Sequence, residues 1–241
     1  MKRVALSGIV AVSVLASAAC SSGTTTSTTQ GAAAGASASG NASSKPLTEY
    51  LLQQSDVPSG FQQQQLPPGA GDAVGSLTDA TKGAKVSPSS CQPDLSKFDA
   101  QQALSTPKAL FADNSTGAAI VNAVSTTASG ANGSVDQFRR YNLGDCATHQ
   151  ITTTVGGNTV TATQKATTLD IDTPGVSGSV VVKTETVAQI PGSSTRTTGQ
   201  YVALLPIPNG AVLVSVSNFM GQPDESVFRQ VVTAAAKRIS G

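Results

Sequence analysis

This 241-residue sequence has no tryptophan, and aromatic residues make up only 4% of it. Charged residues account for 12%, about half the share that is usual in globular proteins. The formal net charge is +1. Phosphate binding requires a clustered excess of Lys and Arg, so this balance excludes nucleic acid as the main partner. No apolar run reaches the roughly 18 residues of a membrane-spanning helix. The core must therefore come from Val, Leu, Ile and Ala.

The first residues form a secretory signal. Met1-Lys2-Arg3 is a short basic start, and an apolar stretch from Val4 to Leu15 follows it. Four small residues, ASAA, then end at Cys20. This order is typical of an export signal.

The cysteine directly after small residues resembles the lipobox of bacterial lipoproteins, although Ser17 stands where that pattern usually has Leu. The resemblance implies that residues 1–19 are removed and that Cys20 is acylated. The alternative is an ordinary signal cleaved near Ala19, which leaves Cys20 as a free thiol.

The segment after Cys20 is a predicted tether. Between Ser21 and Pro46, every residue except Gln30, Asn41, Lys45 and Pro46 is Ser, Thr, Gly or Ala. Such a composition buries too little apolar surface to offset the entropy of ordering, so residues 20–46 are expected to be disordered. Residues 47–241 are long enough for one domain with its own core.

The cysteine count supports this division. The chain has three cysteines, an odd number for an exported protein. If Cys20 carries lipid, Cys91 and Cys146 remain as one pair. Thiol pairs outside the cytoplasm are normally oxidised, so we expect a Cys91–Cys146 disulfide.

The domain is predicted to be α+β. Helices are expected over 46–52, 101–104 and 135–144, and residues 62–100 otherwise read as a long loop. A last helix follows Asp224, with acidic residues at its start, Lys237 and Arg238 in its last turn, and an apolar stripe at helical spacing. Alternating Val- and Thr-rich runs predict strands over 118–124, 151–155, 159–163, 176–190, 197–207 and 211–219. Short connections favour antiparallel pairing. The expected architecture is an antiparallel sheet of four to six strands packed by helices, with an amphipathic C-terminal helix.

Residues that carry chemistry are scarce. His149 is the single histidine, so a nucleophilic triad or dyad would have to use it. No G-x-S-x-G elbow or phosphate-binding loop occurs. Asp170 and Asp172 lie two residues apart, a spacing that suits a paired-carboxylate hydrolase or a solvated strand face. We therefore expect no catalytic residues, no metal site and no cofactor, and we keep an envelope hydrolase using His149 as a lesser alternative.

Several features together resemble the PknH-like extracellular sensor domains of actinobacterial, mycobacterial-type envelope proteins. These features are the cysteine after the signal, the small-residue tether, the opening LLQQSDVPSGF at 51–61, a loop cysteine before a helix, a second cysteine after that helix, and a closing strand–strand–helix order. Members of this family occur as lipoproteins or as outer domains of receptor Ser/Thr kinases. The resemblance implies an antiparallel sheet with helices and a cleft for an unknown ligand, and it implies no catalytic residues.

The sequence thus predicts a non-enzymatic lipoprotein at the extracytoplasmic face of the cell membrane. It would be held by lipid on Cys20 and would bind an unknown ligand or an envelope protein. A carrier of lipid or another apolar ligand is the alternative within the same class.

Overall fold

A computed structural model of the chain describes residues 45–65, 83–93, 105–126, 130–155, 158–189, 194–219 and 221–241. The predicted signal, most of the tether, Cys20 and the expected helix over 101–104 lie outside these residues. Within them, no helix is long and apolar enough to cross a membrane.

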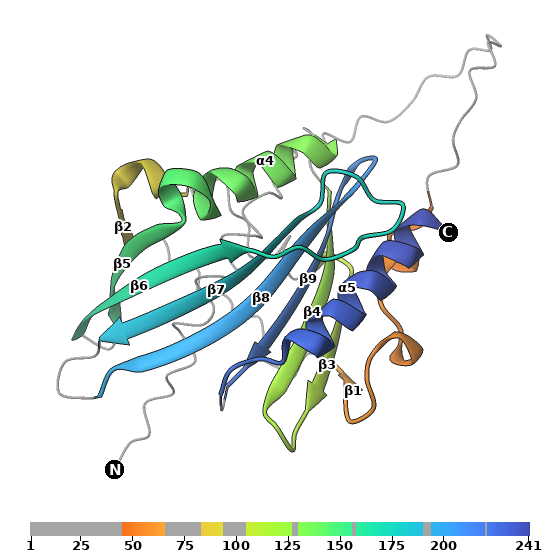
Figure 1. The fold of residues 1–241 in the computed structure, drawn as a ribbon, viewed down its shortest axis with the longest axis horizontal. Coiled ribbons are helices and arrows are strands. Elements are labelled where there is room, and N and C mark those ends of the chain that lie inside the picture. Colours follow the sequence, from red (N-terminus) through yellow and green to blue (C-terminus); the bar gives the residue numbers. More distant parts are fainter. Residues whose placement is uncertain are drawn as a thin grey trace, which may run out of the picture.

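The described residues form one antiparallel sheet of nine strands (Figure 1). Its strand order is β1-β3-β4-β9-β8-β7-β6-β5-β2. The strands are β1 (Gln62–Gln64), β2 (Lys85–Ser87), β3 (Lys108–Asp113), β4 (Ala118–Thr126), β5 (Thr148–Val155), β6 (Asn158–Thr168), β7 (Val180–Gln189), β8 (Arg196–Ile207) and β9 (Gly210–Asn218). The expectation of four to six strands packed by helices is therefore wrong. The sheet is larger, and it dominates the described part of the fold.

Three strands account for the difference. β1 and β2 are three-residue strands at the two edges of the sheet, and their side chains are largely exposed. Short polar edge strands carry no alternating pattern, because neither face has to be buried. β3 does alternate in burial, since Ala109 and Phe111 are buried between less buried neighbours. The sequence hides this alternation, because apolar Leu110 lies between the two buried residues.

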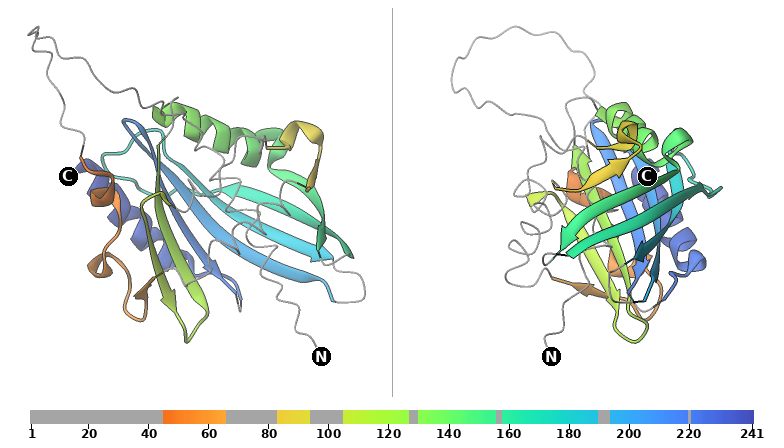
Figure 2. Two further views of the ribbon diagram at one scale, coloured as in Figure 1. Left: turned by 180° about the vertical axis from the view of Figure 1, so that it is seen from behind. Right: turned by 90° about the vertical axis from the view of Figure 1, so that its left-hand side faces the viewer.

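Two α-helices of the described residues lie on opposite faces of the sheet (Figures 1 and 2). They are α4 (Gly130–Asn142) and α5 (Glu225–Ser240). The expected helix over 46–52 is instead one 3-10 turn, η2 (Leu47–Tyr50), because the backbone is extended again at Leu51. A second such turn, η3 (Gln54–Asp56), follows it.

The strands β8 and β9 divide their side chains between two cores. On the face that α5 covers, the α5 face, Leu205 and Val214 pack with Phe228 of the helix. Phe228 also stacks on Tyr201 of β8, with ring centroids 5.2 Å apart. On the opposite face, the α4 face, Leu204 and its neighbours pack against Val135 and Phe138 of α4. Because successive side chains of a strand point to opposite faces, each of these strands contributes to both cores.

A tight turn joins β8 to β9. Pro208 and Asn209 form it, as the sequence predicts, and Gly210 then pairs with Thr126 of β4. A Cβ atom at Gly210 would lie 1.9 Å from the carbonyl oxygen of Ser125. Only glycine permits this approach, so the residue fixes how closely β4 and β9 meet.

Candidate functional site

A groove of about 660 Å³ lies along the outer side of α5. Its volume is in the range of small-molecule sites. The sequence analysis did not identify it, because its two walls are distant in the chain and meet only in the fold. It is lined mainly by polar and charged side chains: Ser55, Asp56, Arg229, Gln230, Thr233, Ala234, Lys237 and Arg238.

An ion pair joins the two walls of this groove. The guanidinium Nε of Arg238 donates to Oδ2 of Asp56, and both side chains are about four-fifths buried. The same Asp56 oxygen accepts from the backbone N–H of Gln53, so the carboxylate is held from both sides. Lys45 donates from Nζ to the carbonyl oxygen of Arg238 at 2.7 Å. Lys45, the next-to-last residue of the predicted tether, is thus fastened beside the groove.

The other end of the groove is fixed to the loop after β6. Arg229 pairs with Glu225 one turn earlier at 2.7 Å, and its Nη1 donates to the carbonyl oxygen of Asp170 at 3.0 Å. The hydroxyl of Thr233 donates to the carbonyl oxygen of Asp172 at 3.4 Å. The backbone carbonyls of Asp170 and Asp172 therefore hold α5 in place, and both residues are exposed. The groove presents amide and ammonium donors from Gln230 and Lys237, which suits a ligand or peptide rich in acceptors.

A second unusual feature is a row of buried polar side chains on the α4 face. Thr184 of β7, Gln200 of β8 and Ser217 of β9 stand directly opposite one another on adjacent strands. All three side chains are at least nine-tenths buried. In the described part of the chain, Oε1 of Gln200 is a buried acceptor without a hydrogen-bond partner. Burial of such a group costs about 1–3 kcal/mol, so this row weakens the core locally.

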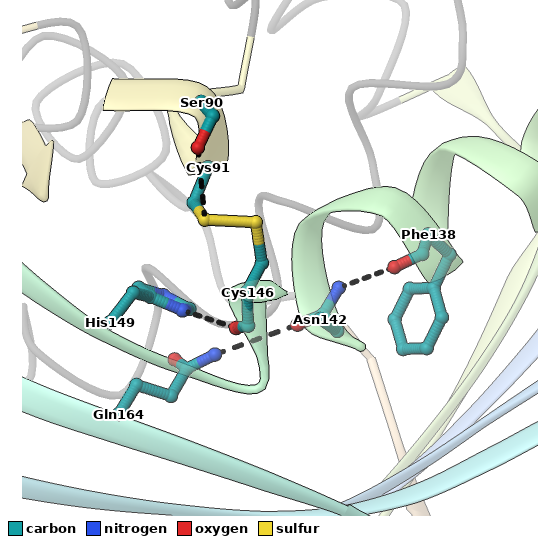
Figure 3. The surroundings of a disulfide bond; sticks show 7 residues. All are labelled: Ser90, Cys91, Phe138, Asn142, Cys146, His149 and Gln164. Carbon is teal, nitrogen blue, oxygen red and sulfur yellow. Dashed lines mark hydrogen bonds between the residues drawn. A yellow bond between two sulfur atoms is a disulfide. The ribbon is translucent and has the colours of Figure 1, made fainter. Parts of the chain in front are cut away.

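The predicted disulfide is present. Cys91 and Cys146 are bonded, and the linked residues are 55 apart in the sequence (Figure 3). The bond joins the 3-10 turn η4 (Ser89–Cys91) to η5 (Gly144–Cys146), just after α4. Both residues are buried. Closing a loop of this length contributes about 4 kcal/mol in the chain-entropy model.

His149 belongs to the surroundings of this disulfide. Its Nδ1 lies 2.9 Å from the carbonyl oxygen of Cys146, and the side chain is buried (Figure 3). Across the strands it faces Gln164, whose Nε2 lies 3.5 Å from Oδ1 of Asn142 at the end of α4. The hydrogen bond of His149 is thus to the backbone beside the disulfide. Among the described residues, no group of three or more His, Cys, Asp or Glu side chains is placed to hold a metal ion.

No family model and no curated protein matches this chain. One solved structure is similar in outline: an uncharacterized protein from Mycobacterium smegmatis, described as an Rv0999 ortholog. The identity is 14%, the similarity covers 81% of this chain and 97% of the other, and the TM-score is 0.44. This structural neighbour is mycobacterial, and its description gives no function.

Proposed function

We propose that this chain is a non-enzymatic lipoprotein, held by lipid on Cys20 at the extracytoplasmic face of the cell membrane, which binds a ligand or an envelope protein. The observation that carries this proposal is the Cys91–Cys146 disulfide. Disulfides persist in oxidising compartments, so the bond supports export. It also uses two of the three cysteines and leaves Cys20 unpaired at the end of the signal-like segment.

Lipidation gives the first test of the proposal. We expect the exported chain to partition into the detergent phase of a two-phase extraction and to incorporate labelled palmitate. Cys20→Ala should lose both properties, because the acceptor thiol is gone. Cys20 precedes the predicted domain of residues 47–241, so we expect folding not to change, and an intact disulfide in the variant checks this. Equal partition of the variant and the parent would contradict the lipid anchor.

The binding part of the proposal is supported by the groove beside α5, which is also where the tether enters the domain. A sensor-like role, as in the PknH-like extracellular domains, is the finer form of this proposal. A photo-cross-linking residue at Gln230 should capture a discrete adduct in intact cells, whereas one at exposed Asn158, at the start of β6, should not. Absence of any adduct at Gln230 in the anchored chain would contradict binding at the groove and leave the lipid anchor unaffected.

A further inference from the structure

The side-chain amide of Gln54 bonds to the outer edge of β1. Nε2 of Gln54 donates to the carbonyl oxygen of Phe61 at 2.7 Å, and Oε1 of the same amide accepts from the backbone N–H of Gln63 at 3.0 Å. These two backbone groups flank Gln62, which pairs with Ala112 of β3. Successive peptide groups of a strand point to opposite sides, so the groups bonded to Gln54 point away from β3.

The opposite edge of the sheet repeats this arrangement. Nε2 of Gln92 donates to the carbonyl oxygen of Ala84 at 3.2 Å, and its Oε1 accepts from the backbone N–H of Val86 at 2.6 Å. These groups flank Lys85 of β2, which pairs with Thr152 of β5. β1 and β2 are the first and last strands of the sheet, and they lie at its two ends in Figure 1. The same side-chain chemistry is therefore found at both edges, which are distant in the sequence and in space.

Each glutamine satisfies the pair of backbone groups that an added strand would use. An antiparallel neighbour would accept from one N–H and donate to the C=O two residues earlier, and the amide does both. Unpaired edges are templates for association with other chains. We propose that Gln54 and Gln92 close the two edges of this sheet against strand addition, and that the partner they exclude is a second copy of this chain.

β1 is the edge at which self-association is expected. Its three residues are all glutamine and all exposed, so it lacks the charge or proline that commonly protects an edge. Uncharged glutamine side chains also stack favourably between identical strands. β2 carries Lys85, which disfavours pairing with another copy. Removal of the Gln54 and Gln92 amides should therefore give a symmetric dimer in which the β1 strands of two copies pair in antiparallel orientation.

The test is the oligomeric state of the full purified chain over a wide concentration range, measured by light scattering after size-exclusion chromatography. The parent should stay monomeric, and Gln54→Ala/Gln92→Ala should show a concentration-dependent dimer. Hydrogen exchange at the Gln63 and Val86 amides should be roughly threefold to tenfold faster in the dilute variant, as expected for the loss of one hydrogen bond each. Gln150→Ala/Gln189→Ala is the matched control, because these exposed glutamines lie on β5 and β7, where both neighbours are already present.

A charged variant separates edge opening from general destabilisation. Gln54→Lys/Gln92→Lys also removes the amide contacts, but it places a charge at each edge. We expect fast exchange at Gln63 and Val86 and a monomer at all concentrations. The proposal is overturned if the alanine variant stays monomeric while both amides exchange faster. It is equally overturned if the lysine variant or the matched control dimerises as strongly as the alanine variant.

Discussion

At the scale of single residues, Asn122 joins two distant parts of the fold through its side-chain amide. It is fully buried in the middle of β4, on the α5 face. Its Oδ1 accepts from the backbone N–H of Leu52 at 2.7 Å, and its Nδ2 donates to the carbonyl oxygen of Leu213 at 3.0 Å. One amide thus joins the segment before β1 to the centre of the sheet.

Asn122→Ala should lower the free energy of unfolding by about 2–4 kcal/mol. The substitution leaves a buried backbone donor without its acceptor and opens a small cavity. Urea denaturation would measure the change, with Asn158→Ala at an exposed strand end as the control that stays within about 0.5 kcal/mol. A midpoint unchanged from that of the parent would show that water replaces the Asn122 contacts.

The sequence predicts the contacts of some single residues but not of others. The Cys91–Cys146 disulfide is confirmed. It could be predicted because only one pair of cysteines remains once Cys20 is set aside. Asn122 and Gln200 could not be singled out. Strand periodicity indicates which face a side chain occupies, but it does not indicate the partners of that side chain. Leu52 and Leu213, the partners of Asn122, are 70 and 91 positions away, and the residues opposite Gln200 are on other strands. The groove is missed for the same reason, since Asp56 and Arg238 are 182 positions apart.

At the scale of elements, α5 shows how its ends are set by local charge. Asp224 is the N-cap, and its Oδ1 accepts from both the backbone N–H and the hydroxyl of Ser226 at 2.7 Å. The Ser226 hydroxyl and backbone N–H hold the pKa of Asp224 below its ordinary value of about 3.9. Lys237 and Arg238 in the last turn complement the helix dipole, as the sequence predicts.

Asp224 should therefore make a pH-dependent contribution to stability. Because its folded pKa is depressed, that contribution is present above pH of about 4 and is lost as the pH falls through the lower folded value. The difference in melting temperature between the parent and Asp224→Ala should be largest near neutral pH and should shrink on acidification. Asp224→Asn caps equally well without titrating, so its advantage over alanine should stay constant. A parent–alanine difference that is the same at pH 3 and pH 7 would contradict this account.

Long elements are predicted better than short ones. β8, β9 and α5 lie within a few residues of the expected ranges, because each buries a continuous apolar stripe. β1 and β2 could not be predicted, since three exposed residues such as Gln62–Gln64 carry no period. They are placed in the sheet by pairing with β3 and β5, and no periodicity within three residues describes that pairing.

At the scale of the whole molecule, the two faces of the sheet are tied together through shared strands. Leu204 and Leu205 are consecutive in β8, yet Leu204 belongs to the core under α4 and Leu205 to the core under α5. The strand β9 also contributes to both cores, with Leu213 in the core under α4 and Val214 in the core under α5. The two cores therefore share these strands. Loss of either layer removes support from the backbone that carries the other.

This arrangement predicts one cooperative unfolding transition rather than two. Leu204→Ala and Leu205→Ala remove the same atoms from neighbouring positions that are 2% and 0% exposed. Each should lower the free energy of unfolding by about 2–5 kcal/mol. The third tyrosine, Tyr141, lies on α4, so both variants are made with Tyr141→Phe, and tyrosine fluorescence then reports only Tyr50 and Tyr201 on the α5 face. That fluorescence should change at the same urea concentration as hydrogen exchange of the α4 amides. If Leu204→Ala shifted only the α4 amides and left the tyrosine transition in place, the two layers would be separate folding units. The shared alternation of β8 and β9 makes that outcome unfavourable, because melting one face unpairs the strands that the other face requires.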